Sequence, residues 1–338
     1  MSEFVLIARY FTRPAVRAVL GVGDDCALLQ PAAGMQLAIS SDMLVEGRHF
    51  FADVDPAALG HKALAVNLSD LAACGAKPLA FTLALALPRV DEAWLAAFSC
   101  GLLDLADQHG CELVGGDTTQ GPLNICITVF GEVPTGQALL RSGARAGDDL
   151  YVSGTLGDAR LALETLRGRH GLPAGLLQAA RRRLEQPTPR VALGLALRGI
   201  ASAAIDISDG LLGDLAHVLK ASRVGATLDT SIAITLIAAC AHDDWARGII
   251  LLERQLEYTL AGGDDYELAF TAPVSARAAV QAAAQLADTP ATRIGCIEKT
   301  PGLRLIDAQG QLLANRFNSF DHFSAAAALG RLDDKPGA

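Results

Sequence analysis

Short strand-like runs of apolar residues alternate with helix-like segments along the chain, and this alternation limits the possible fold more than any other feature. The apolar runs at 35–41 and 79–87 have the length of strands, whereas 56–74 and 91–109 have the length of helices. This order predicts an α/β or α+β protein and argues against a helix bundle or a β-sandwich.

The alternation falls into two series, separated by LRSGARAGDD at 140–149, a segment rich in glycine and charge that is typical of a joint between domains. The first series ends with predicted strands at 111–115 and 123–132. In the second series we predict strands at 150–153, 203–206, 225–229 and 267–272, a helical region at 158–198 and a helix at 211–222.

A chain of 338 residues is longer than one compact core usually is, so two domains are expected. We predict an N-terminal domain at 1–139, a C-terminal domain at 140–325 and a frayed polar tail at 326–338. Apolar residues make up 51% of the sequence and charged residues 19%, a balance that supports large cores and excludes a disordered chain.

The net charge of −9, without any Lys/Arg-rich run, argues against nucleic acid as a partner. An acidic protein can still hold an anionic nucleotide if bound cations supply positive charge. No apolar run reaches membrane-spanning length, and the N-terminus lacks the apolar core of a signal peptide. Seven scattered cysteines without a C-x-x-C pair predict buried thiols in a reducing compartment, so the expected location is the cytoplasm, with no membrane partner.

Seven aspartates lie next to apolar segments: Asp24, Asp25, Asp42, Asp70, Asp117, Asp206 and Asp209. Singly, each could cap a helix or shape a turn. Together, with few basic residues nearby and with hydroxyls beside several of them, they match the oxygen ligands that hard cations prefer. Because magnesium usually bridges protein carboxylates to substrate phosphates, the pattern favours a site for several magnesium ions and a phosphorylated substrate.

The glycines in GVGDD, GGDTT and GGDDYE would allow the backbone to approach a polyphosphate, although each could equally serve a tight turn. The P-loop, the protein-kinase motifs, the zinc motifs and the nucleophile elbow are all absent from the sequence. VNLSDL at 66–71 and IDISDGL at 205–211 share a pattern that marks either an internal duplication or a chance similarity.

The segments GVGDDCALL, AISSDMLVEGRHF, KALAVNLSDLAACGAKP, LVGGDTT, RSGARAGD, IDISDGL, GGDDYEL and FDHF occur in this order from about residue 3 to residue 323. Together they resemble the thiamine-monophosphate kinase family. The resemblance implies an α+β protein of the aminoimidazole ribonucleotide synthetase-like fold, with two α/β-type domains. It also implies that the N-terminal domain binds ATP and magnesium and pairs with a second copy in a homodimer.

The resemblance assigns roles to individual residues. The implied magnesium ligands are Asp24, Asp25, Ser40, Ser41, Asp42, Asp70, Asp117, Asp206 and Asp209. The residues implied for ATP are Gly116, Asp117, Arg141 and Ser208, and those for thiamine monophosphate are His49, Asp264 and Phe320. Many family members carry Glu where Asp264 stands.

The activity implied is direct in-line transfer of the γ-phosphoryl group of ATP to thiamine monophosphate, which yields thiamine diphosphate. The acceptor is already an ionised phosphate ester, so no general base is assigned. Two alternatives stay open at this point: another ATP-dependent enzyme of the superfamily with a different acceptor, or a non-catalytic sensor of Mg-ATP.

Overall fold

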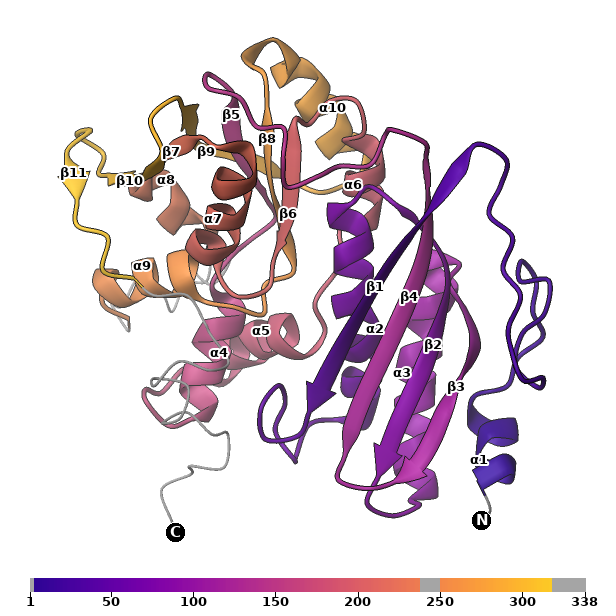
Figure 1. Cartoon of the computed structure of the whole chain (residues 1–338). Coiled ribbons are helices and arrows are strands. Elements are labelled where there is room, and N and C mark those ends of the chain that lie inside the picture. The colour runs from indigo at the N-terminus through magenta and orange to yellow at the C-terminus, as the bar shows by residue number, and fades with distance from the viewer. Residues whose placement is uncertain (1–2, 238–249, 318–338) are drawn as a thin grey trace. The chain divides into compact units, whose positions relative to one another are not determined.

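The computed structural model describes residues 3–237 and 250–317, which divide into two compact units. The first unit comprises residues 3–71 and 76–136, and the second comprises 72–75, 137–237 and 250–317. Each unit is built around one β-sheet with helices packed against it (Figure 1).

The first unit contains a four-stranded sheet in the order β1-β4-β2-β3, in which β2 and β3 are parallel and the other neighbours antiparallel. Its strands are β1 (Met35–Val45), β2 (Lys77–Leu87), β3 (Glu112–Gln120) and β4 (Asn124–Pro134). Its helices are α1 (Glu3–Tyr10), α2 (Pro56–Ala73) and α3 (Glu92–His109), and α2 ends in the residues assigned to the second unit.

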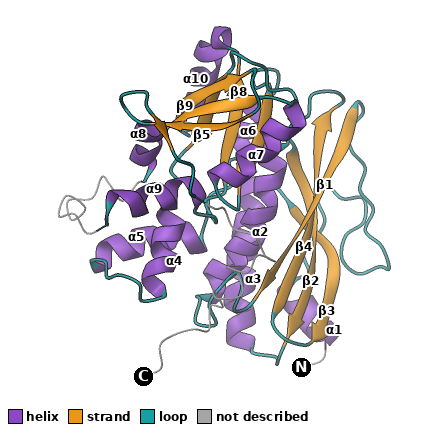
Figure 2. Cartoon of the chain, turned by 60° about the vertical axis from the view of Figure 1, so that its left-hand side comes forward, coloured by secondary structure: helices purple, strands orange, loops and turns teal. Residues whose placement is uncertain are grey.

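Helices α2 and α3 cover one face of this sheet and leave the other face open (Figure 2). The alternation of side chains along the strands follows that arrangement, since Ile125, Ile127 and Val129 of β4 are buried. On the open face, large apolar side chains remain exposed, including Ile39 at 60% and Met43 at 53%. Isolated exposed apolar residues are ordinary. Here Leu37, Ile39 and Met43 form a row of exposed apolar residues along one strand.

The second unit contains a seven-stranded mixed sheet in the order β11-β10-β7-β9-β5-β8-β6. Its strands are β5 (Asp149–Ser153), β6 (Ala203–Ile207), β7 (Gly225–Asp229), β8 (Glu267–Ala272), β9 (Ala291–Glu298), β10 (Gly302–Ile306) and β11 (Leu312–Leu313). Its helices are α4 (Asp158–Leu166), α5 (Ala174–Glu185), α6 (Val191–Ala196), α7 (Leu211–Ser222), α8 (Thr230–Ala233), α9 (Leu252–Ala261) and α10 (Arg277–Leu286).

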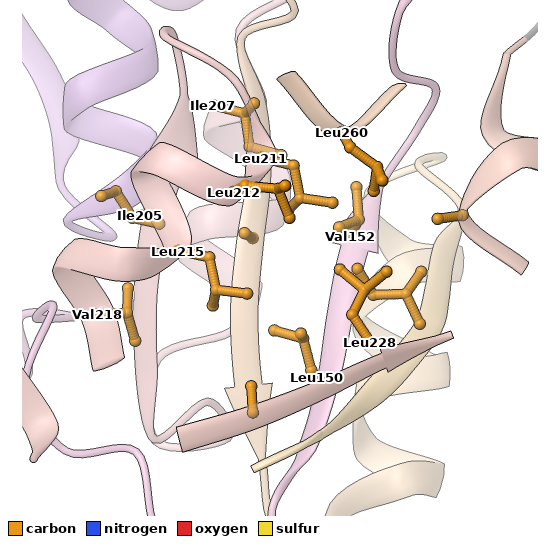
Figure 3. Packing of buried hydrophobic residues seen from close by; sticks show 14 of the residues in the cluster. Leu150, Val152, Ile205, Ile207, Leu211, Leu212, Leu215, Val218, Leu228 and Leu260 are labelled. Atoms are coloured by element: carbon orange, nitrogen blue, oxygen red, sulfur yellow. The ribbon is translucent and has the colours of Figure 1, made fainter. Parts of the chain in front are cut away.

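The main core of this unit lies between the sheet and α7 (Figure 3). Every residue of β5, β6 and β8 is buried, as expected for strands covered on both faces. Ile207 at the end of β6 and Leu211 at the start of α7 are both fully buried in this core. The three residues between them, 208–210, are therefore anchored at both ends.

The predicted alternation of strands and helices is confirmed, but several elements differ from the prediction. Helices α1, α8, α9 and α10 were not predicted from the sequence. The helical region predicted at 158–198 is three helices, α4, α5 and α6. Glycines and Pro173 interrupt the chain between the first two, and Pro187 and Pro189 lie between the last two. Strands β9, β10 and β11 were not predicted from the sequence either, although β9 pairs with both β5 and β7. The predicted tail at 326–338 lies outside the described residues.

Candidate functional site

In the first unit, the hydroxyl of Ser40 and the carboxylate of Asp70 meet where β1 lies beside α2, and Asp42 lies two residues further along β1. The Ser40 hydroxyl donates a short hydrogen bond to the Asp70 carboxylate. The backbone N–H of Asp42 donates to Asn67 Oδ1 at 3.1 Å. Because Ser40 and Asp42 are two residues apart on a strand, their side chains share one face of β1. Asn67 and Asp70 are three apart on α2 and share one face of that helix.

Asn67 was not singled out from the sequence, yet it holds β1 in place against α2. Its side chain is 1% exposed, and its Nδ2 donates to the Ala63 carbonyl at 3.0 Å, which fixes the amide so that Oδ1 faces Asp42. An amide directly after the apolar run ALAV at 63–66 of the helix was the signal that could have identified it. A buried amide needs partners of this kind.

Ser41 lies on the opposite face of β1 from Ser40 and Asp42. Its hydroxyl is 2.9 Å from Thr128 Oγ1 and donates to the Ile127 carbonyl at 3.1 Å, both on β4. Within the first unit, the structure therefore groups Ser40, Asp42 and Asp70 and does not group Ser41 with them.

Gly116 and Asp117 lie on β3, where the backbone at Gly116 has a φ of +146°. A Cβ on Gly116 would come within 1.8 Å of the Leu83 carbonyl oxygen of β2, so only glycine fits there. The exposed Asp117 pairs with Ala84 of β2, which is also exposed on the open face. The glycine is thus required for the close pairing of β2 and β3 that places Asp117.

Asp24 and Asp25 are exposed in the loop enclosed by the bridge between Leu20 and Leu28. The Asp24 carboxylate accepts the Asp25 N–H at 2.8 Å. The chain before this loop is tied to β3 by Glu112, whose carboxylate accepts the backbone N–H groups of residues 16, 17 and 18 at 3.1, 2.7 and 3.0 Å. Neither aspartate is buried, although both lie next to apolar residues in the sequence.

His49 lies in the turn that follows β1. Its Nδ1 accepts the backbone N–H of Val45 at 3.0 Å, so the proton of the neutral ring belongs on Nε2. The Lys62 ammonium donates to the His49 carbonyl at 3.4 Å, although Lys62 is only 2% exposed. Lys62 is a second residue that sequence reasoning missed, and a lysine within an apolar helix was its signal.

In the second unit, IDISDGL forms the end of β6, a tight loop and the start of α7. Asp206 is buried on β6, while Ser208 and Asp209 in the loop are half-buried. The loop is held by Asp214, whose Oδ2 accepts the backbone N–H groups of Ser208, Asp209 and Gly210 at 3.1, 3.0 and 3.1 Å. Burial raises the pKa of Asp214 to about 7 despite these hydrogen bonds, which favour the charged form.

Asp264 lies beside this loop. Its backbone N–H donates to the Ser208 carbonyl at 2.9 Å, and the Tyr266 N–H donates to the Ile207 carbonyl at 2.8 Å. The backbone at Asp264 has a φ of 65° and that at Tyr266 a φ of 50°, conformations that non-glycine residues rarely adopt. The Tyr266 hydroxyl is 3.4 Å from Asp264 Oδ1. The structure therefore brings Ser208, Asp209 and Asp264 together.

Two acidic residues that follow Asp264 in the sequence, Asp265 and Glu267, are buried. Asp265 Oδ1 accepts the Gly157 N–H at 2.9 Å, and its Oδ2 has no hydrogen-bond partner among the described residues. Burial raises the pKa of Asp265 well above its usual range. Glu267 is fully buried and accepts hydrogen bonds from Ser153 at 2.6 Å, Arg183 at 2.7 Å and Arg190 at 2.6 Å.

Arg141 lies in the exposed segment before β5. The Ser222 hydroxyl at the end of α7 donates to the Arg141 carbonyl at 3.2 Å, and it accepts the N–H groups of Gly143 and Ala144 at 3.1 Å each. This segment is therefore tied to α7, while the Arg141 side chain remains exposed. Phe320 lies outside the described residues.

The predicted site residues are divided between the two units, and each group is defined within its own unit. Across residues 3–237 and 250–317, no group of three or more His, Cys, Asp or Glu side chains is arranged to hold a metal ion. A hydroxyl and two carboxylates at Ser40, Asp42 and Asp70 nevertheless suit magnesium, because this ion takes most of its ligands from water and substrate phosphates.

The cysteines differ from the expectation of buried thiols. Cys111 is buried, but Cys26, Cys100 and Cys296 are exposed. Cys240 lies outside the described residues. No helix within the described part of the chain combines the length and the apolar character needed to cross a membrane.

Comparison with known proteins matches both halves of the chain. Residues 23–133 match the N-terminal domain of AIR synthase related proteins, and residues 145–308 match their C-terminal domain. The thiamine-monophosphate kinase of Escherichia coli is 45% identical over 335 residues, which cover 96% of this chain and 98% of the relative.

Solved structures agree with the sequence matches. The crystal structure of thiamine-monophosphate kinase from Stenotrophomonas maltophilia is 44% identical, with a TM-score of 0.80 over 92% of this chain and 96% of that one. The structure of AaThiL complexed with AMPPCP and TMP is 29% identical, with a TM-score of 0.72 over 87% of this chain and 89% of that one.

Proposed function

The chain belongs to the thiamine-monophosphate kinase family, and we infer from this membership that it transfers the γ-phosphoryl group of ATP to thiamine monophosphate. The observation that supports this function most strongly is the sequence identity of 44–45% to family members, which extends over nearly their whole length and across both domains. The AaThiL complex supports both substrates, since AMPPCP is an ATP analogue and TMP is thiamine monophosphate. The products are ADP and thiamine diphosphate.

Magnesium is proposed as the cofactor, held in part by Ser40, Asp42 and Asp70. Two observations support magnesium binding: the three residues lie where β1 meets α2, and their side chains offer the oxygen ligands that magnesium prefers. We propose the other donors of the family pattern as ligands of further magnesium ions: Asp24, Asp25, Ser41, Asp117, Asp206 and Asp209. Ser41, on the opposite face of β1 from Ser40, would bind a different ion from Ser40. When bound, the ions neutralise phosphate charge so that two anions can approach each other.

The ATP phosphates are proposed to contact Gly116, Asp117, Arg141 and Ser208, the first through the backbone and Asp117 through magnesium. The lack of a side chain at Gly116 leaves its backbone accessible. The guanidinium of Arg141 carries a permanent charge in a planar fork that matches a phosphate group, and it extends from a segment anchored at Ser222.

Thiamine monophosphate is proposed to contact His49, Asp264 and Phe320. The neutral His49 ring would donate from Nε2 to the substrate phosphate. The thiazolium ring of thiamine is permanently cationic, so the Asp264 carboxylate would attract it, and an aromatic face at Phe320 would add cation–π attraction. The hydrogen bond between the Asp264 N–H and Ser208 supports a fixed position for that carboxylate.

Transfer is proposed to be direct and in-line. The acceptor oxygen belongs to a phosphate ester that is ionised at neutral pH, so no side chain is needed as a general base. The residues of the site act by binding and orienting the two substrates and by stabilising the charge that develops during transfer.

We also propose a homodimer formed through the open face of the four-stranded sheet. The exposed row of Leu37, Ile39 and Met43 supports this surface, because a second copy would cover it. A cytoplasmic location is proposed as well, in keeping with ATP as a substrate and with the free thiols of six cysteines.

Acceptor selectivity tests the proposed function. With saturating Mg-ATP, kcat/KM for thiamine monophosphate should greatly exceed that for an uncharged monophosphate ester. The Asp264→Asn variant should lose part of this preference while its KM for ATP stays unchanged, and Asp264→Glu should keep the preference. Equal activity on both acceptors would show that another acceptor class is the substrate.

A further inference from the structure

One side-chain oxygen holds the entire loop at 208–210, hereafter the ATP-side loop. Asp214 Oδ2 accepts the N–H groups of Ser208, Asp209 and Gly210 at distances from 3.0 to 3.1 Å. Asp214 is 5% exposed and lies in the first turn of α7. Three successive amides are therefore satisfied by a buried carboxylate that is itself assigned no substrate contact.

Contacts other than the one with Asp214 also restrict the conformation of the ATP-side loop. Ile207 before it and Leu211 after it are anchored in the core shown in Figure 3. Gly210 has a φ of +114°, and a Cβ there would lie 2.8 Å from the Ala261 carbonyl carbon. With both ends fixed, the conformation of the intervening amides depends on the acceptor that Asp214 provides.

The same arrangement extends to the loop at 262–266, hereafter the acceptor-side loop. The Ser208 carbonyl accepts the Asp264 N–H at 2.9 Å, and the Ile207 carbonyl accepts the Tyr266 N–H at 2.8 Å. The peptide group between Ser208 and Asp209 thus joins the two residues: its N–H donates to Asp214, and its carbonyl accepts the Asp264 N–H. A rotation of that peptide would move both loops.

We propose that Asp214 is a positioning residue. It fixes the backbone conformation of the ATP-side loop, and through it that of the acceptor-side loop, before substrate binds. The proposal rests on the proposed function, which assigns Ser208 and Asp209 to ATP and its metals and Asp264 to the acceptor. Asp214 acts only through these residues, by fixing the backbone from which their side chains extend.

Kinetics of two substitutions test the proposal. Asp214→Ala removes the shared acceptor, so kcat/KM for thiamine monophosphate at saturating ATP should fall about 100-fold, as for a misplaced binding group. The KM for ATP should rise as well. Asp214→Asn keeps an oxygen acceptor of the same length and should stay within about 5-fold of the parent, because it preserves the hydrogen-bond acceptor.

Asp148 provides a matched control in the same unit. It is also 5% exposed, and its carboxylate accepts the Arg145 N–H at 2.9 Å and the Ser202 hydroxyl at 2.6 Å, at the other end of β6. Asp148→Ala should lower thermal stability and leave kcat/KM unchanged. If folded Asp214→Ala keeps the parent kcat/KM, or if both alanine variants lose activity equally, the proposal is wrong.

Amide hydrogen exchange in the unsubstituted full chain tests the role of Asp214 even if the Asp214→Ala variant does not fold. Without nucleotide, the amides of residues 208–210 should already exchange slowly, because Asp214 satisfies them. If these amides exchange rapidly without nucleotide and become slow only when Mg-ATP is added, the proposal is wrong. This measurement does not depend on turnover, so a chain that showed slow exchange but did not phosphorylate thiamine monophosphate would contradict the proposed function alone.

Discussion

Asp42 and Asp70 stand at the centre of the proposed magnesium site, and the fold holds them by different means. Asp42 is fixed through its backbone, which donates to Asn67, whereas Asp70 is engaged through its carboxylate by Ser40. Asn67 and Asp70 both belong to α2. A single helix therefore carries Asp70 and also holds the backbone of Asp42 through Asn67.

Asp42→Asn should nearly abolish turnover while the thermal unfolding temperature stays close to that of the parent. The amide keeps the shape of the side chain but removes the negative charge that attracts a hard cation. Turnover at saturating ATP across a range of magnesium concentrations measures the effect. Asp104→Asn, on the exposed side of α3, serves as the control and should change nothing. Wild-type turnover of both Asp42→Asn and Asp70→Asn at ordinary magnesium concentration would contradict the metal assignment.

At the level of single residues, the sequence predicted candidate residue types but not their orientation. Ser40 and Ser41 are neighbours in the sequence, yet β1 directs them to opposite faces. Asp214 carries no signature of its own, because its function depends on backbone groups that only the fold brings near. Asn67 carries only a weak one, an amide next to apolar residues of a helix, which does not reveal its backbone partner.

Asp265 should make the stability of the protein depend on pH. Burial raises its pKa, so the folded chain keeps a proton that the unfolded chain has lost above about pH 3.9. Stability from this group is thus complete at low pH and declines as pH rises toward the folded pKa. The free energy of unfolding of Asp265→Asn, measured from pH 4 to pH 8 by chemical denaturation, should rise relative to the parent as pH increases. A constant difference across that range would show that Asp265 is ionised in the folded protein.

Among the elements, β3 depends on a single glycine, Gly116, for its close pairing with β2. Gly116→Ala would place a methyl group 1.8 Å from the Leu83 carbonyl oxygen, so β3 would have to move away from β2. We expect a loss of about 3 kcal/mol in the free energy of unfolding, together with weaker use of ATP because Asp117 moves with the strand. At the neighbouring Gly115, the nearest atom to an added Cβ is 3.8 Å away, so Gly115→Ala should have little effect. Equal stability of the two variants, measured by denaturant unfolding, would contradict this explanation.

Most elements could be predicted from apolar periodicity, and the exceptions have physical reasons. The similarity between VNLSDL and IDISDGL does not reflect a repeated structure, because the first lies in α2 and the second spans β6, a loop and α7. Four or five residues of apolar-polar alternation suit a helix or a strand, and the surrounding chain decides between them. Strands β9 and β10 are only partly buried, so their apolar pattern is weaker than that of β5 or β8.

For the whole molecule, the open sheet face leads to a prediction about assembly. Ile39→Lys would place a charge in the proposed interface and should convert a dimer to a monomer, measured by sedimentation velocity. Leu286→Lys, at an apolar residue of α10 that is 83% exposed, serves as the control and should leave the dimer intact. A parent protein that sediments as a monomer, or an Ile39→Lys variant that remains a dimer, would exclude this interface.

The fate of the γ-phosphoryl group tests the central claim most directly. The full chain is incubated with magnesium, thiamine monophosphate and ATP labelled only in the γ-phosphoryl group, and the products are separated and identified. Direct transfer predicts that the label appears in the terminal phosphoryl group of thiamine diphosphate and that unlabelled ADP forms in equal amount. Formation of AMP, or release of all the label as inorganic phosphate without thiamine diphosphate, would contradict the account.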